Sequence, residues 1–99
     1  MKIDFSAPIL NIDGAPIKDG DGELTLKTVA YSVLLGTEQA DFAASVTEKE
    51  DRFDLAVKIS SGGIVEIKAE EGALLKRLIG KKCPPLIVGR AFQIIEKSE

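Results

Sequence analysis

The chain has 99 residues, of which 44% are hydrophobic and 29% charged, and its formal net charge is −3. These values predict one globular domain, residues 1–99, with no stretch apolar enough to span a bilayer. Histidine is absent and cysteine occurs once, which excludes Ser-His-Asp and Cys-His arrangements within this chain and zinc sites built from these two residue types.

We therefore expect a protein that is not an enzyme, with no catalytic residues, no cofactor and no metal. A single cysteine cannot form an internal disulfide, so nothing requires an oxidising compartment. The first ten residues, MKIDFSAPIL, contain an acid and only a short apolar run, unlike a signal peptide. A cytoplasmic location is the expectation.

Residues 1–22 have the pattern of extended structure. The dipeptide Asp13-Gly14 is a strong tight-turn signal. Leu10 and Ile12 precede it and Ile17 follows it, which predicts a β-hairpin. The second turn cluster, residues 19–22, is interpreted as an exposed loop before the first helix.

Two helices are predicted in the middle of the chain. Apolar residues recur at helical spacing over 26–34, and Gly36 ends that segment. Residues 37–46 are the least determined and are interpreted as a connection with a helical turn, in which Phe42 and Val46 point inward. Thr47 and Glu50 form an S/T-x-x-E capping box that begins the next helix. Its predicted inward residues are Phe53, Leu55, Ala56, Val57 and Ile59.

The C-terminal third predicts a short strand and two helices. Residues 64–68, IVEIK, are β-branched and follow two glycines, and this strand is expected to pair with the extended piece before the first helix. Acids begin the next helix and Gly80 is expected to end it. Pro84 and Pro85 open the last helix, which is apolar almost all round and so is either deeply buried or covered by another chain. The predicted fold class is α+β, mostly helical, with about four helices and a small antiparallel sheet.

Several motifs have simpler structural interpretations. The stretch DGDGE does not fit an EF-hand in either register, and no phosphate-binding loop motif is present. The acidic pairs Asp51/Asp54 and Glu70/Glu71 suit first turns and polar helix faces. Cys83 follows two lysines and precedes a helix start, features that favour a thiolate. Without a histidine or a second cysteine, the thiol is interpreted as a packing residue.

The distribution of charge points to a binding surface. Residues 1–71 contain 14 acids and 7 bases, whereas residues 72–99 contain 2 acids and 6 bases. Cations therefore surround the bend between the last two helices, beside apolar side chains that suit the centre of an interface. We predict a protein–protein interaction or assembly protein, whose partner is another protein or a second copy of this chain in an oligomer. The predicted partner surface consists of Arg77, Lys81, Lys82, Leu86, Arg90 and Phe92.

An alternative is a nucleic-acid-associated regulator that uses the last two helices like a helix-turn-helix. The spacing is suitable, but the second helix offers only Arg90 and Gln93 as base-reading side chains, where three or four are normally needed. The net negative charge also disfavours nucleic acid as a partner.

The chain resembles a group of small proteins encoded by bacteriophages and prophages. The resemblance rests on NIDGAPIKDGD, LTLKTV, EKEDRFDLAVKI, VEIKAEEGALLKRLIGK and PPLIVGRAFQII, and so extends over nearly the whole chain. It implies a phage-derived cytoplasmic protein of a family without an assigned activity. No functional residue is carried over by it.

Overall fold

The computed structural model describes residues 1–97 and confirms the predicted α+β class, mostly helical with two small antiparallel sheets. The helices are α1 (Leu26–Leu34), α2 (Gln39–Phe42), α3 (Val46–Ile59), α4 (Ala69–Lys82) and α5 (Pro85–Glu96). The strands are β1 (Lys2–Asp4), β2 (Lys18–Asp19), β3 (Gly22–Glu23) and β4 (Ile64–Glu66).

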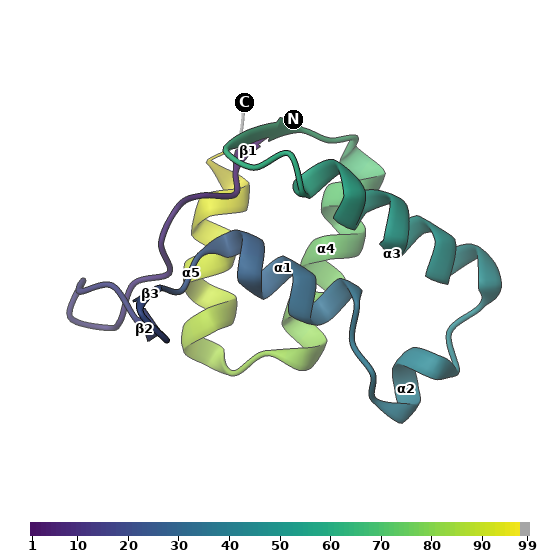
Figure 1. Ribbon diagram of the computed structural model, residues 1–99, viewed down its shortest axis with the longest axis horizontal. Helices are drawn as coiled ribbons and strands as arrows, with labels where there is room; N and C mark the ends of the chain where they lie inside the picture. Colours follow the sequence, from purple (N-terminus) through teal and green to yellow (C-terminus); the bar gives the residue numbers. More distant parts are fainter. Residues whose placement is uncertain (98–99) are drawn as a thin grey trace.

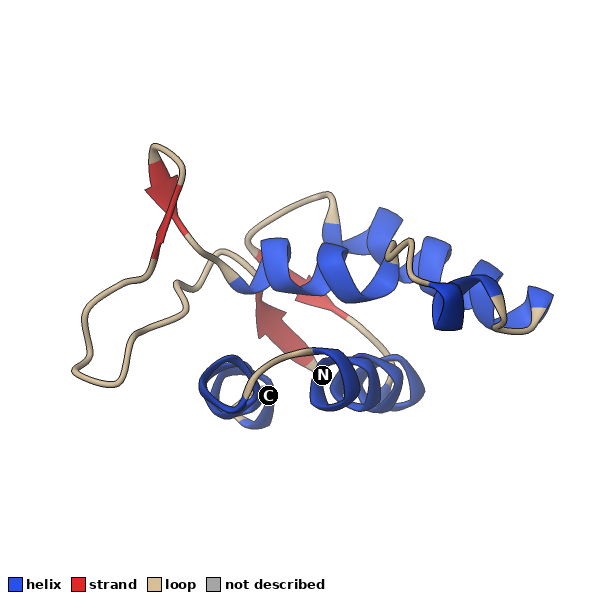
Figure 2. Ribbon diagram, turned by 90° about the horizontal axis from the view of Figure 1, so that it is seen from below, coloured by secondary structure: helices blue, strands red, loops and turns tan. Residues whose placement is uncertain are grey.

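The helices form two layers. Helices α1 and α3 run across the view in Figure 2, with α2 at the far end of this layer, while α4 and α5 lie beneath them and are seen end-on. Helix α1 is central because it packs against both α3 and α4 (Figure 1). The β1–β4 ribbon lies at one end of the helices, and the segment that carries β2 and β3 projects from the opposite side to α3.

The strand β4 pairs with the N-terminal strand β1, so the predicted pairing with residues just before α1 is wrong. The ribbon is antiparallel and places Ile3 opposite Val65. Both side chains are buried, whereas both residues of β3 are exposed. Burial of an apolar cross-strand pair therefore decides the partner of β4.

The projecting segment, residues 10–24, contains two turns, and we call it the arm. The Asp13-Gly14 turn is present, since Leu10 pairs with Pro16 across it in a single bridge. The regular two-strand hairpin is β2–β3, closed by Gly20-Asp21, so the cluster interpreted as a loop is a tight turn. Gly20 has a φ of +62°, which glycine adopts without steric cost.

Two helix ends differ from the predicted ones. Helix α3 begins earlier because the Ser45 hydroxyl accepts a hydrogen bond from the Glu48 N–H, and Ser45 and Glu48 have the same S/T-x-x-E spacing as the expected cap. Helix α4 continues past Gly80 to Lys82. It ends at Cys83, which is extended because the residue before a proline disfavours the α conformation.

The core lies where α1, α3, α4, α5 and the β1–β4 ribbon meet. Helix α5 is neither deeply buried nor widely exposed: Ala91 and Ile95 are buried, and its other large apolar side chains are half-buried. The core also includes Phe5 and Ile9 from the N-terminal segment. Its remaining members are Ile3, Leu26, Val29, Ala30, Val33, Leu34, Leu55, Ala56, Ile59, Val65, Ile67, Leu75, Leu78 and Ile79.

Candidate partner-binding surface

The structure does not bring the predicted basic residues into one free patch. Arg77 turns toward α3 and pairs with Glu48 at 2.5 Å, and Lys82 pairs with Asp41. Arg90 donates to the Asn11 carbonyl in the arm at 2.8 Å. Because α3 and the arm lie on opposite sides of the α4–α5 pair (Figure 1), Arg77 and Arg90 face different ways.

The other predicted residues have mixed environments. Lys81 is exposed, and Leu86 and Phe92 are half-buried. The Phe92 ring lies beneath the ammonium of Lys76, 5.0 Å from the ring centroid, and Lys76 also pairs with Glu96. Much of the C-terminal positive charge is thus engaged within the fold, and the predicted six-residue surface stays a prediction.

A buried ion network joins α2, α3 and α4. Asp41 and Arg52 are both buried, and their side chains pair at 2.9 Å. The Asp41 carboxylate also pairs with Lys82, and Glu48 links Arg52, at 2.6 Å, to Arg77. Arg52 Nε has no hydrogen-bond partner among residues 1–97, so the charge of the guanidinium is compensated through these two carboxylates.

The network fixes the short segment that the sequence left least determined. Asp41 points inward and Phe42 and Val46 point outward, the reverse of the prediction for the two apolar residues. Gly36 makes the arrangement sterically possible, since a Cβ there would lie 2.4 Å from Asp41 Oδ2 and 2.8 Å from Lys82 Nζ. Any larger residue at position 36 would have to displace the ion pair.

Helix α3 carries a second apolar face that points to solvent. The predicted inward residues Leu55, Ala56 and Ile59 are buried, but Phe53 and Val57 are 60% and 54% exposed, so the prediction for these two was wrong. Val46 lies seven residues before Phe53 and therefore on the same side of the helix. Phe42, just before α3, is also exposed. We call Phe42, Val46, Phe53 and Val57 the apolar strip.

The sequence contained a signal for this orientation. Residues 46, 53 and 57 make one helical stripe, and residues 52, 55, 56 and 59 make another. The prediction took residues of both stripes as inward, Phe53 and Val57 from the first and Leu55, Ala56 and Ile59 from the second. Arg52 belongs to the second stripe, and Asp41 and Glu48 neutralise its charge. These ion pairs allow the second stripe, arginine included, to face the core.

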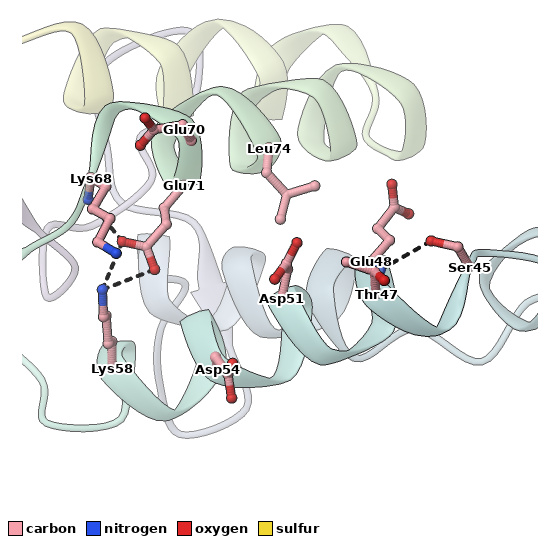
Figure 3. A pocket seen from close by; sticks show the side chains of 10 residues that line it. All are labelled: Ser45, Thr47, Glu48, Asp51, Asp54, Lys58, Lys68, Glu70, Glu71 and Leu74. Atoms are coloured by element: carbon pink, nitrogen blue, oxygen red, sulfur yellow. Dashed lines mark hydrogen bonds and ion pairs between the residues drawn. The ribbon is translucent and has the colours of Figure 1, made fainter.

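An acidic cleft lies between α3 and α4, beside the apolar strip. It has a volume of about 820 Å³. Ion pairs connect the two helices at both of its ends, Glu48–Arg77 and Lys58–Glu71. Asp51 and Leu74 point toward each other across it (Figure 3). The lining residues are Ser45, Thr47, Glu48, Asp51, Asp54, Lys58, Lys68, Glu70, Glu71 and Leu74.

Two carboxylates of the cleft, those of Glu48 and Glu71, have lowered pKa values and are ionised at neutral pH. The hydrogen bond from Arg52 is the largest cause that holds the pKa of Glu48 below the ordinary value of 4.5; burial opposes it and Arg77 adds to it. Burial acts to raise the pKa of Glu71, but hydrogen bonds from Lys58 and from the Lys68 N–H outweigh it, so this pKa is also lowered. Asp51, Asp54 and Glu70 have no ion pair among residues 1–97. Lys68 lines the same cleft and has no ion pair in this part of the chain either, so three such carboxylates against one ammonium leave the cleft with net negative charge.

Cys83 lies at the bend between α4 and α5 and is half-buried. Burial raises the pKa of its thiol above the ordinary value of 9.0, and the positive charge of Lys82 opposes this only in part. The Lys82 ammonium is already paired with Asp41, which reduces its effect on the thiol.

We predict that Cys83 reacts slowly with iodoacetamide. At pH 8 the folded protein should react at least about threefold more slowly than the same protein unfolded in guanidinium, because less thiolate is present. Its rate should still be rising above pH 9, as expected for a raised pKa. A folded rate above the unfolded one would contradict this and support the alternative of an activated nucleophile.

The residues proposed for base recognition interact with each other. Arg90 Nη1 donates to Gln93 Oε1 at 3.3 Å, in addition to its bond with the Asn11 carbonyl. Reading a base edge would require Arg90 to give up both contacts. The nucleic-acid alternative stays a prediction, and no contact described here favours it.

Comparisons with protein-family models, with curated proteins and with solved structures give no match for this chain. Within residues 1–97, no cluster of three or more His, Cys, Asp or Glu side chains is placed to hold a metal ion. In the same part of the chain, no helix has the length and apolar character needed to cross a bilayer.

Proposed function

We propose that this chain is a non-enzymatic, cytoplasmic protein-binding module of bacteriophage or prophage origin, and that the apolar strip is its contact surface. The origin rests on the sequence resemblance alone. The surface rests on the exposure of Phe42, Val46, Phe53 and Val57.

The observation behind this proposal is that the side chains of the apolar strip are exposed and take no part in the core. The core contains Phe5 and Ile9 at 0% exposure, so apolar side chains are well buried elsewhere. Val46, Phe53 and Val57 lie along one side of α3, and Phe42 is exposed on α2 four residues before Val46; such exposed apolar side chains suit the centre of a protein interface. The ion network fixes α2, and so holds Phe42 next to α3 without burying it.

The surface differs from the one predicted from charge alone. Arg77 and Lys82 support the strip indirectly, since their partners Glu48 and Asp41 belong to α3 and α2. The function class, protein binding, is the same in both proposals. What changes is that apolar side chains of α2 and α3, instead of cations of α4 and α5, make the contact.

The test is affinity capture from cells that produce the protein, with three forms of it as bait. The double variant Phe53→Ser/Val57→Ser should lose the proteins that the unchanged chain retains, by about 30-fold or more, as for removal of central apolar anchors. Ile12→Ser is the matched control, because Ile12 is 83% exposed but lies in the arm. Circular dichroism establishes that all three forms are folded.

The proposal predicts that the Ile12→Ser variant and the unchanged chain retain the same proteins. Identical capture by all three forms would overturn the strip as the contact surface. A fourth form, Arg90→Ala, is tested in the same way, and loss of capture with this variant alone would return the contact to the α4–α5 bend.

A further inference from the structure

We propose that the partner of the apolar strip is a basic amphipathic helix of another protein, whose lysine or arginine side chains enter the α3–α4 cleft. This inference rests on the proposed function, since it names the chemistry of the partner at the same surface. The observation that supports this inference is that the strip and the cleft lie side by side along α3.

The strip and the cleft share α3 side by side. Val46, Phe53 and Val57 belong to the strip, and the residue that follows each of them, Thr47, Asp54 and Lys58, lines the cleft. Successive residues are about 100° apart around a helix, so the two surfaces run parallel. A ligand that covers the strip therefore has the cleft along one edge.

The length of the strip suits a helix. From Val46 to Val57 it covers twelve residues of α3, and the rise between the first and the last is about 17 Å, or three helical turns. Apolar side chains spaced three and four residues apart on a partner helix would meet it in the way that amphipathic helices bind apolar surfaces.

The charges beside the strip select a basic partner. Glu50 lies on the strip side of α3 and is exposed, and Asp51 and Asp54 line the cleft without an ion pair among residues 1–97. Glu70 adds a further carboxylate from α4. Leu74 provides an apolar contact within the cleft, against which the methylene stem of a lysine or arginine can pack.

A second copy of this chain fits the surface less well. The chain has a net charge of −3. Of its six C-terminal cations, three form the ion pairs Lys76–Glu96, Arg77–Glu48 and Lys82–Asp41, and Arg90 donates to the Asn11 carbonyl. A lipid surface is also disfavoured, because carboxylates beside an apolar strip are repelled by anionic headgroups.

The experiment uses two synthetic, fluorescently labelled peptides of 14 residues, the length of α3. Both carry leucines at helical spacing; one has lysines and the other glutamates on the flanks. Binding to the full chain is measured by fluorescence anisotropy at low and at high salt. The lysine peptide should bind and the glutamate peptide should not. High salt should weaken the binding of the lysine peptide.

Two charge variants separate the cleft from the general charge of the protein. The double variant Asp51→Asn/Asp54→Asn should lower the affinity for the lysine peptide by about tenfold at low salt, as expected for the loss of two nearby charges. Asp19→Asn/Asp21→Asn removes the same charge from the arm and should change binding by less than about twofold. Phe53→Ser/Val57→Ser should abolish binding.

Each other outcome overturns the inference in an identifiable way. If both charge variants lower the affinity equally, the lysine peptide is attracted by the net charge of the protein and not by the cleft. If both peptides bind equally and Phe53→Ser/Val57→Ser abolishes this binding, the partner need not be basic. The apolar strip would still be the contact surface, as the proposed function states. No binding of either peptide, together with dimers in light scattering that Phe53→Ser/Val57→Ser dissociates, would identify a second copy as the occupant.

Discussion

Replacing Asp41 by alanine is expected to destabilise the protein by about 3–5 kcal/mol, the usual cost of breaking a buried ion pair by removing one partner. The Arg52 guanidinium would remain buried with Glu48 as its only carboxylate, and Lys82 would lose its ion pair. Domains of this size are stable by about 5–15 kcal/mol, so the loss is a large part of the total. Urea unfolding followed by circular dichroism measures it.

Two further variants test the cause. Asp54→Ala is the control, because Asp54 is exposed and its loss should change stability by no more than about 0.5 kcal/mol. The double variant Asp41→Ala/Arg52→Met should recover part of the loss, because the charge that Asp41 compensates is gone. A loss below about 1 kcal/mol for Asp41→Ala would mean that the network contributes little to the fold.

Replacing Phe5 by alanine is expected to cost about 3–5 kcal/mol, the range for truncating a buried aromatic ring. Phe5 is 0% exposed and is the largest fully buried side chain among residues 1–97. Its backbone also holds elements together, since its N–H donates to the Gly63 carbonyl and its carbonyl accepts from the Lys27 N–H. Urea unfolding gives the free energy directly.

Phe53→Ala is the matched control, because it makes the same chemical change at a position that is 60% exposed. It should cost less than about 1 kcal/mol, since most of the ring is already in water. The same variant should weaken partner binding. Comparable destabilisation by the two substitutions would contradict the outward orientation of Phe53 and with it the proposed surface.

The ion network and the apolar strip form a connected arrangement. Asp41 holds α2 against α3 and α4 through Arg52 and Lys82. The neighbouring residue, Phe42, is thereby placed in solvent beside the N-terminal end of α3. A variant that breaks the network is expected to release this part of the surface, so stability and binding should be measured on the same samples.

The sequence by itself determined the fold class and the approximate position of every long helix. Apolar residues at helical spacing defined α1, and acids at the start of α4 and Pro85 at the start of α5 marked those helices. These signals act within one or two helical turns, through capping, dipole and steric effects that neighbouring residues alone decide. The Asp13-Gly14 turn was readable for the same reason.

Only the tertiary structure decided which faces and strands meet. Helix α3 has two apolar stripes, and its core face depends on whether Arg52 finds carboxylates, which Asp41 supplies from eleven residues away. The pairing of β4 with β1 joins residues sixty or more positions apart, and depends on burying Ile3 against Val65. Lys82 likewise meets Asp41 only when α2 reaches the end of α4. Such contacts depend on which distant groups share a buried site, and local sequence pattern does not encode that.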